Sequence, residues 1–169
     1  KRESELSKKF SGLIIKKILG NELIKSFALP KKIHGTIFSK STSGMKYGRH
    51  IDNAYMSSGR ADLSFTVFLN CKKKYEGGAL SIQGLNSEKK FKLDAGEIII
   101  YPSTYLHSVE KVIDGERLVF IGWIESYVKS IEEREYLFDL DAAARSLLAK
   151  YGRSCLLYTS PSPRDISWS

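Results

Sequence analysis

Between residues 45 and 124, short apolar runs alternate with turn residues, and this alternation limits the possible fold more than any other feature. The runs are rich in β-branched and aromatic residues and comprise Met45–Asn53, Leu63–Leu69, Ala79–Gln83, Lys89–Leu93, Glu97–Tyr101, His107–Val112 and Arg117–Ile124. Turn-forming residues separate these runs, among them Asp94-Ala95-Gly96, Pro102-Ser103 and Asp114-Gly115. Short strands at this spacing predict an antiparallel sandwich or jelly roll.

Helical patterns flank this block on both sides. The first predicts a helix at 8–19 that ends before a break at Gly20-Asn21, and Pro30 then starts an extended segment. The second predicts a helix at 130–151, for which Gly152 suits the C-cap. An amphipathic stripe along this second helix consists of Ile131, Leu137, Leu140, Ala144, Leu147 and Leu148. The expected fold is therefore mainly β with flanking helices.

The length of 169 residues and the 42% hydrophobic content suit one domain with a real core. We expect this domain to span residues 1–154, with its β core at 33–124. The first residue is Lys1, so we expect the chain to begin inside a longer protein. Residues 155–165, CLLYTSPSPRD, resemble the translation of a sequencing adaptor. We therefore expect 155–169 to be a non-native tail; the alternative is a native, disordered Pro/Ser tail.

The formal net charge is +8, and the excess lysines are scattered in short runs. Such runs usually form a solvated basic surface, and the alternative is attraction to nucleic acid or to an acidic substrate. Nucleic acid is the less favoured partner, because no aromatic-rich RNA-binding signature or zinc-finger spacing accompanies the charge. Cys71 and Cys155 make neither a disulfide framework nor a metal cluster, which favours a reducing, cytoplasmic setting. No apolar run is long enough to span a membrane.

His50 and Asp52 stand two positions apart in a predicted strand. Residues i and i+2 of a strand project to one face about 6.5–7 Å apart, so both side chains could reach one ion. The pair alone is weak evidence, because such residues more often form the polar edge of a strand. His107 opens a later strand of the same block. His-x-Asp followed by a distant His is the pattern of the facial triad of non-haem Fe(II) oxygenases, which leaves three metal positions open.

Arg117 lies in the otherwise apolar run GERLVFIGW. A buried arginine is costly unless it meets an anion, and its fork suits the far carboxylate of a 2-oxo acid. The alternative is a structural ion pair with Asp52, Asp62 or Glu125. If Asp114-Gly115 were a two-residue hairpin turn, Arg117 would face away from His107. The two side chains share an interior if the loop is longer, or if their strands lie in opposite sheets of a sandwich.

Several longer stretches together carry a resemblance to a known family. They are ALP at 28–30, YGRHIDNA at 47–54, RADLSFTVFLN at 60–70, YEGGAL at 75–80, LDAGEIIIYPSTYLHSV at 93–109, GERLVFIGWIESYV at 115–128 and EREYLFDLDAA at 133–143. In these stretches the chain resembles PKHD-type hydroxylases, a bacterial branch of the Fe(II)/2-oxoglutarate dioxygenases related to prolyl and lysyl hydroxylases. The segment between Asp52 and Arg60 is shorter than is usual in them.

The resemblance implies a double-stranded β-helix of the jelly-roll or cupin-like kind, with an N-terminal helix and a C-terminal helical extension. It implies that His50, Asp52 and His107 bind Fe(II) and that Arg117 binds 2-oxoglutarate. The expected reaction uses O2, hydroxylates an unidentified small molecule or peptide, and releases succinate and CO2. Similar proteins are also associated with ascorbate, which keeps the iron reduced.

Other side chains have less definite roles. Tyr47, Thr66 and Tyr101 are candidate contacts to the cosubstrate, and plain packing is the alternative for each. Trp123 alternates in register with Arg117, so we expect it to line the interior as core packing rather than to stack on substrate. Glu76-Gly77-Gly78 reads as a turn, and His34 has no assigned function.

Two other classes of function compete with the oxygenase. One is a non-catalytic, cupin-like protein that binds a metal or a small acid, and the other is a basic nucleic-acid-associated module. Arg117 discriminates against the first, because a mere metal binder has no need of a buried guanidinium. The second predicts binding that weakens steeply with salt.

Overall fold

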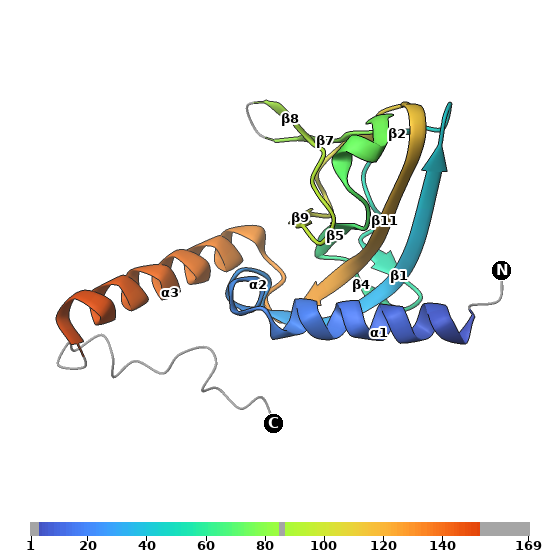
Figure 1. Ribbon diagram of the computed structural model, residues 1–169. Coiled ribbons are helices and arrows are strands. Elements are labelled where there is room, and N and C mark those ends of the chain that lie inside the picture. Colours follow the sequence, from blue (N-terminus) through green and yellow to red (C-terminus); the bar gives the residue numbers. More distant parts are fainter. Residues whose placement is uncertain (1–3, 85–86, 153–169) are drawn as a thin grey trace.

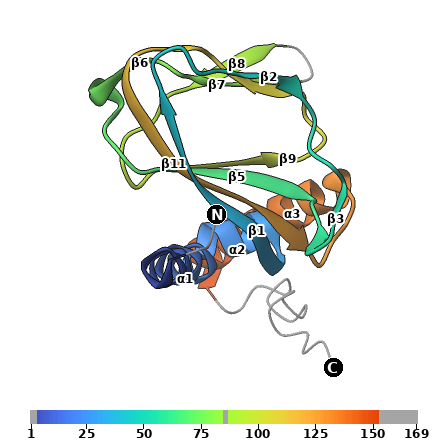
Figure 2. The same cartoon turned by 90° about the vertical axis from the view of Figure 1, so that its right-hand side faces the viewer.

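A computed structural model describes residues 4–84 and 87–152, so the predicted tail at 155–169 lies outside the described residues. Two antiparallel sheets face each other, and the helices lie at one end (Figures 1 and 2). The elements are α1 (Glu5–Gly20), α2 (Glu22–Ala28), β1 (Pro30–Thr42), β2 (Tyr47–His50), β3 (Tyr55–Met56), β4 (Gly59–Arg60), β5 (Leu63–Phe68), the 3-10 turn η1 (Lys72–Lys74), β6 (Tyr75–Gly77), β7 (Leu80–Gln83), β8 (Glu88–Phe91), β9 (Ile98–Pro102), β10 (His107–Val109), β11 (Val112–Ser126) and α3 (Ile131–Tyr151). The predicted fold, mainly β with flanking helices, is confirmed.

The larger sheet has the strand order β1-β11-β5-β9, and β6 also pairs with β11. The smaller sheet has the order β2-β10-β7-β8, and β3 and β4 form a separate pair. All of these pairings are antiparallel. His107 on β10 and Arg117 on β11 therefore belong to opposite sheets. This is one of the two arrangements in which both side chains can face the same interior. None of the described helices is both long and apolar enough to cross a membrane.

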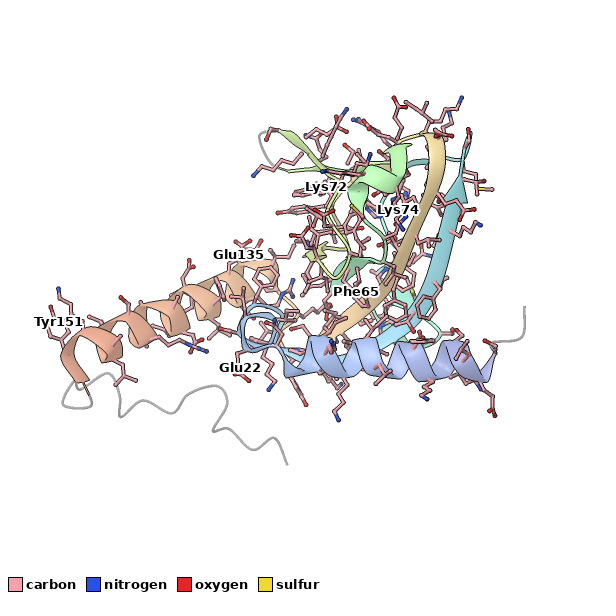
Figure 3. The ribbon with its side chains drawn as sticks, viewed as in Figure 1. Glu22, Phe65, Lys72, Lys74, Glu135 and Tyr151 are labelled. Carbon is pink, nitrogen blue, oxygen red and sulfur yellow. The ribbon has the colours of Figure 1, made fainter. Side chains whose placement is uncertain are left out.

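The helices cover the outer face of the larger sheet. Ile18, Ile24 and Ala28 of α1 and α2 form one buried cluster with side chains of β5 and β11. The sheet residues of this cluster are Leu63, Phe65, Val67, Phe120 and Ile124, and Figure 3 shows Phe65 on this side of the sheet. Side chains alternate between the two faces of a strand, so the intervening residues of β5 and β11 point toward the smaller sheet. This packing leaves the inner face of the larger sheet free to line a site.

Two predicted turns are instead parts of strands. Asp114-Gly115 lies inside β11, which pairs there with β6, so the prediction of a turn was wrong. Glu76-Gly77 lies in β6 itself, so that prediction was also wrong. Both segments contain glycines with positive φ, 76° at Gly115 and 68° at Gly77, and an added Cβ would lie 2.3 Å and 2.2 Å respectively from a backbone carbonyl oxygen. Glycine is therefore required here by close backbone approach within a strand pair rather than by a chain reversal.

The ends of the helices differ in some details from the predicted ones. The break at Gly20-Asn21 is confirmed, but Asn21 also begins α2, because its side chain accepts a hydrogen bond from the backbone of Ile24 at 3.1 Å. Gly152 caps α3 as predicted, with φ 69° and its N–H bonded to the Leu148 carbonyl. The helix projects away from the sheets, and its apolar stripe is half-buried apart from exposed Leu140 (Figure 1).

We expect the substitution Gly115→Ala to destabilise the fold. An added Cβ would lie 2.3 Å from the Lys74 carbonyl oxygen and 2.9 Å from the Tyr75 Cα, at a φ that disfavours side chains. Strain of this kind costs about 1–3 kcal/mol, which urea denaturation followed by circular dichroism measures directly. Gly12→Ala is the control, because nothing lies within 4 Å of its added Cβ in α1 and the helix should gain about 0.5–1 kcal/mol. Equal effects of the two substitutions would contradict this account of β11.

Candidate active site

A cavity of about 540 Å³ lies between the two sheets. The structure brings every predicted site residue to its wall: His50, Asp52, His107, Arg117, Tyr47, Thr66 and Tyr101. Apolar side chains of β11, among them Val119 and Ile121, line the same space. The cavity therefore combines an apolar lining with a small number of polar groups, which is typical of small-molecule sites.

Two histidines and one aspartate converge at one end of the cavity. One ligand atom from each of His50, Asp52 and His107 lies within 4.8 Å of the others. The Nε2 atom of His50 is 3.6 Å from Oδ1 of Asp52, and the Nε2 atom of His107 is 3.8 Å from Oδ2. His107 on β10 stands directly opposite His50 on β2. The expected strand ends at His50, so a loop carries Asp52 into place, where its N–H donates to the Ser103 carbonyl at 3.1 Å.

Backbone carbonyls fix the tautomer of both imidazoles. Nδ1 of His50 lies 2.9 Å from the Gly48 oxygen, and Nδ1 of His107 lies 2.9 Å from the Tyr105 oxygen. A carbonyl only accepts, so each Nδ1 carries a proton, and Nε2 is the ring nitrogen that remains to bind a metal beside Asp52. Two such imidazoles and a carboxylate are the donor set of a facial Fe(II) site. The side chains present thus fit this metal.

Asp52 receives two side-chain hydrogen bonds that the sequence did not predict. Ser64 Oγ donates to its Oδ2 at 2.5 Å, and Trp123 Nε1 donates to the same atom at 3.0 Å. Trp123 was expected to be core packing, and its N–H contact with Asp52 corrects that expectation. The available signal for Ser64 was its inward register with Thr66 along an otherwise apolar strand.

Arg117 is 4% exposed and lies on the inner face of β11. Its Nε atom has no hydrogen-bond partner within residues 4–84 and 87–152, and no carboxylate of these residues forms an ion pair with it. The alternative acids are engaged elsewhere, since Asp62 pairs with Arg60 and Glu125 with Lys31. Burial lowers the pKa of Arg117. A buried cation without an acidic partner among the described residues calls for an anionic ligand.

The remaining predicted contacts surround these groups. The Tyr101 ring lies 5.1 Å from the His107 ring, and burial raises the pKa of its phenol. Thr66 is buried beside them, whereas Tyr47 is 61% exposed and its ring lies 4.5 Å from that of His50. Near Arg117, the hydroxyl of Tyr75 is buried, and burial raises its pKa. The cosubstrate roles of Tyr47, Thr66 and Tyr101 stay predictions.

His34 serves the fold rather than the cavity. Its Nδ1 lies 2.8 Å from Ser58 Oγ and its Nε2 lies 2.9 Å from the Arg60 carbonyl, so it ties β1 to the β3–β4 pair. We expect His34→Ala to lower the free energy of unfolding by about 1–3 kcal/mol, because it leaves buried partners unsatisfied. The affinity for Mn(II), measured by electron paramagnetic resonance of the free ion, should stay unchanged. A large loss of Mn(II) affinity in this variant, while circular dichroism shows that it remains folded, would show that the metal site is misassigned.

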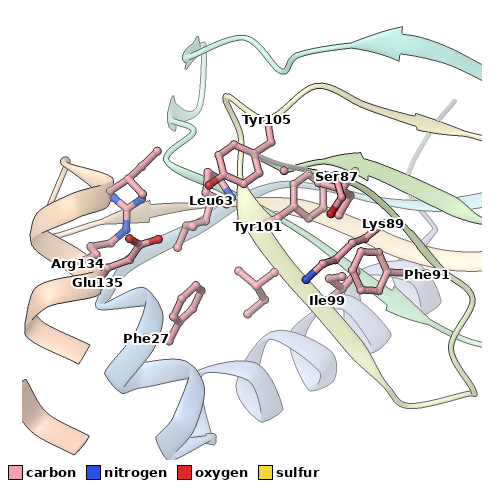
Figure 4. A pocket seen from close by; sticks show the side chains of 15 residues that line it. Phe27, Leu63, Ser87, Lys89, Phe91, Ile99, Tyr101, Tyr105, Arg134 and Glu135 are labelled. Atoms are coloured by element: carbon pink, nitrogen blue, oxygen red, sulfur yellow. The ribbon is translucent and has the colours of Figure 1, made fainter. Parts of the chain in front are cut away.

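A second cavity, of about 480 Å³, is lined by residues of α2, α3 and the edge strands β8 and β9 and shares Tyr101 with the first (Figure 4). Its wall is mainly aromatic and aliphatic, with Phe27, Phe91 and Tyr105 among its residues. Arg134 and Glu135 stand at its helical side. The one described cluster of three or more possible metal ligands is the His50, Asp52 and His107 group in the first cavity.

A jelly roll whose sheets enclose two histidines, one aspartate and a buried arginine has the fold and site of a non-haem Fe(II) oxygenase. The family model for the 2OG-Fe(II) oxygenase superfamily matches residues 36–125, which include all four of these side chains. The chain belongs to this superfamily. It is therefore an oxidoreductase of the class that uses Fe(II), 2-oxoglutarate and O2.

Similar proteins agree with this membership and confirm the predicted resemblance. A PKHD-type hydroxylase of Prochlorococcus marinus strain MIT 9215 is 77% identical over 153 residues, which cover 90% of this chain and 69% of that protein. A PKHD-type hydroxylase of strain NATL2A is 59% identical over the same shares. Among solved structures, a Pseudomonas putida prolyl-4-hydroxylase has a TM-score of 0.55 at 22% identity, covering 73% of this chain and 69% of that one. This last likeness supports the fold.

Proposed function

We propose that this chain is a hydroxylase in which His50, Asp52 and His107 hold Fe(II) and Arg117 binds the distal carboxylate of 2-oxoglutarate. The observation that carries the proposal is the buried guanidinium of Arg117, which has no acidic partner among the described residues, in the cavity that also holds the three ligand side chains. Iron, with 2-oxoglutarate and O2, supplies the oxidising chemistry that hydroxylates a C–H bond and releases succinate and CO2. A non-catalytic cupin-like protein that binds only a metal gives no reason for this arginine.

The chain's own residues provide binding, orientation and exclusion of water. The fork of Arg117 can hold a carboxylate bidentately, which fixes the direction of an elongated 2-oxo acid along the cavity. Val119 and Ile121 give the same wall an apolar surface that disfavours bulk water. Each imidazole holds its Nδ1 proton on a backbone carbonyl, which leaves Nε2 as the nitrogen that would bind a metal.

The substrate enters the proposal as a small molecule or a peptide. Exposed Met45, Tyr47 and Ile37 stand at the solvent side of the cavity and would meet it first. The net charge of +8 favours an acidic partner over a basic one. Four expectations from the sequence stay predictions: a cytoplasmic setting, a role for ascorbate, a single domain at 1–154, and a substrate or partner other than nucleic acid.

The test is an anaerobic titration of the protein with Fe(II) and 2-oxoglutarate. The proposed chelate should give a weak visible charge-transfer band that requires both additions. Air should then yield succinate in the presence of protein, at a rate that His34→Ala retains in proportion to its folded fraction. Metal binding without any band or succinate would instead support the cupin-like binder.

A further inference from the structure

We propose that Ser64 and Trp123 are positioning residues that hold Asp52 so that it offers only Oδ1 to the metal. The inference rests on the proposed function, because it concerns the carboxylate of the same metal site. It adds two residues that neither touch the metal nor belong to the His-x-Asp…His pattern.

The two donors come from neighbouring strands and reach one oxygen atom. Ser64 of β5 and Trp123 of β11 stand directly opposite each other in the ladder, on the face that lines the cavity. Both donate to Oδ2 of Asp52, at 2.5 Å and 3.0 Å respectively. No hydrogen bond to Oδ1 occurs among the described residues, and this atom lies 3.6 Å from Nε2 of His50. The carboxylate therefore has one engaged oxygen and one available oxygen.

A third side chain orients the serine. Ser103 Oγ lies 2.8 Å from Ser64 Oγ, and both residues are almost fully buried. The hydroxyl proton of Ser64 is committed to Asp52, so Ser103 must be the donor in this pair. The Ser103 carbonyl also accepts the backbone N–H of Asp52 at 3.1 Å. These hydrogen bonds hold Asp52 at two points, at its backbone N–H and at its side-chain carboxylate.

The indole is also fixed in place. Gly35 of β1 has φ 61°, and an added Cβ there would lie 2.6 Å from the Trp123 ring. A register shift between His34 and Ile37 makes room for this close approach. The ring thus packs against backbone that carries no side chain, which limits the directions in which its N–H can point.

Holding Oδ2 has a chemical consequence for the metal. A carboxylate that binds through both oxygens takes two coordination positions, whereas one that binds through Oδ1 alone takes one. A facial triad has three positions left only in the second case, two for a chelating 2-oxo acid and one for O2. By engaging Oδ2, Ser64 and Trp123 would leave Asp52 to bind a metal through Oδ1 alone, besides orienting the carboxylate.

The test measures Mn(II) affinity without turnover, by electron paramagnetic resonance of the free ion. Ser64→Ala and Trp123→Phe should each weaken Mn(II) binding by about 10–100-fold, as loss of outer hydrogen bonds to a ligand does. Ser64→Thr keeps the hydroxyl and should restore most of the affinity. Ser81→Ala is the matched control, because Ser81 is an equally buried strand serine that donates to Glu88 at 2.6 Å instead. It should bind Mn(II) like the parent.

The possible outcomes distinguish a failure of the positioning role from a failure of the proposed metal site. If the parent binds Mn(II), His107→Ala does not, and Ser64→Ala binds as tightly as Ser81→Ala, the positioning role is wrong while the proposed metal site stands. If the parent itself does not bind Mn(II), the proposed function fails together with this inference. Should Trp123→Phe melt below the assay temperature, the comparison of Ser64→Ala, Ser64→Thr and Ser81→Ala still gives the answer.

Discussion

His107→Ala abolishes both the charge-transfer band and succinate formation under the proposed function. The substitution removes one of the two Nε2 ligand atoms and leaves His50 and Asp52 as an incomplete set. Loss of an outer hydrogen bond already costs about 10–100-fold in metal affinity, so loss of a ligand should cost more. Anaerobic titration with Fe(II) in saturating 2-oxoglutarate, followed in the visible range, measures the effect. His50→Ala should behave in the same way.

His34→Ala is the matched control for this result, since His34 and His107 are both 6% exposed. It removes an equally buried imidazole whose two nitrogens are bound to Ser58 and Arg60 rather than free for a metal. The control should lose stability and keep the band, whereas His107→Ala should lose the band. If both variants keep the band, His107 is no ligand, and if both lose it, the effect of His107→Ala is one of folding.

Arg117→Met should change stability and cosubstrate binding in opposite directions. Without ligand, the substitution removes a buried charge that has no acidic partner among the described residues, so the melting temperature should stay the same or rise. With 2-oxoglutarate, it removes the partner of a carboxylate, which costs about 2–5 kcal/mol or roughly 30-fold or more in Kd. Thermal melting with and without 2-oxoglutarate measures both effects.

A second 2-oxo acid and a second arginine variant serve as controls for Arg117→Met. 2-Oxobutyrate lacks the distal carboxylate, so the parent should strongly prefer 2-oxoglutarate and Arg117→Met should not. Arg134→Met is the matched control, because Arg134 is 3% exposed but donates to the carbonyls of Val128 and Lys129. It should lower the melting temperature and leave the preference intact. An Arg117→Met protein that still prefers 2-oxoglutarate would contradict the assigned role of the guanidinium.

The strand block and the site residues could be predicted because they depend on local pattern and residue chemistry. Side-chain alternation gave the inward face of β11, and the types and spacing of His50, Asp52 and His107 suggested a metal. The sheet in which each strand lies could not be predicted, because pairing partners in a sandwich are far apart in sequence. The relation of His107 to Arg117 therefore stayed open until β10 and β11 were found in opposite sheets.

The predictions from local sequence were wrong where a glycine could indicate either a turn or close packing of the backbone. Asp114-Gly115 has the composition of a tight turn, but Gly115, with its positive φ, lies in a continuous strand where the Lys74 carbonyl leaves no room for a Cβ. The donors to Asp52 were missed for a related reason. Ser64 and Trp123 stand opposite each other only through the register of β5 with β11, which no single stretch of sequence specifies.

The most direct test of the central claim is an anaerobic crystal structure of the protein with Mn(II) and 2-oxoglutarate. We expect one metal ion bound by Nε2 of His50, Oδ1 of Asp52 and Nε2 of His107. The distal carboxylate of 2-oxoglutarate should bind the guanidinium of Arg117. A metal ion bound elsewhere, or 2-oxoglutarate with its distal carboxylate away from Arg117, would contradict it.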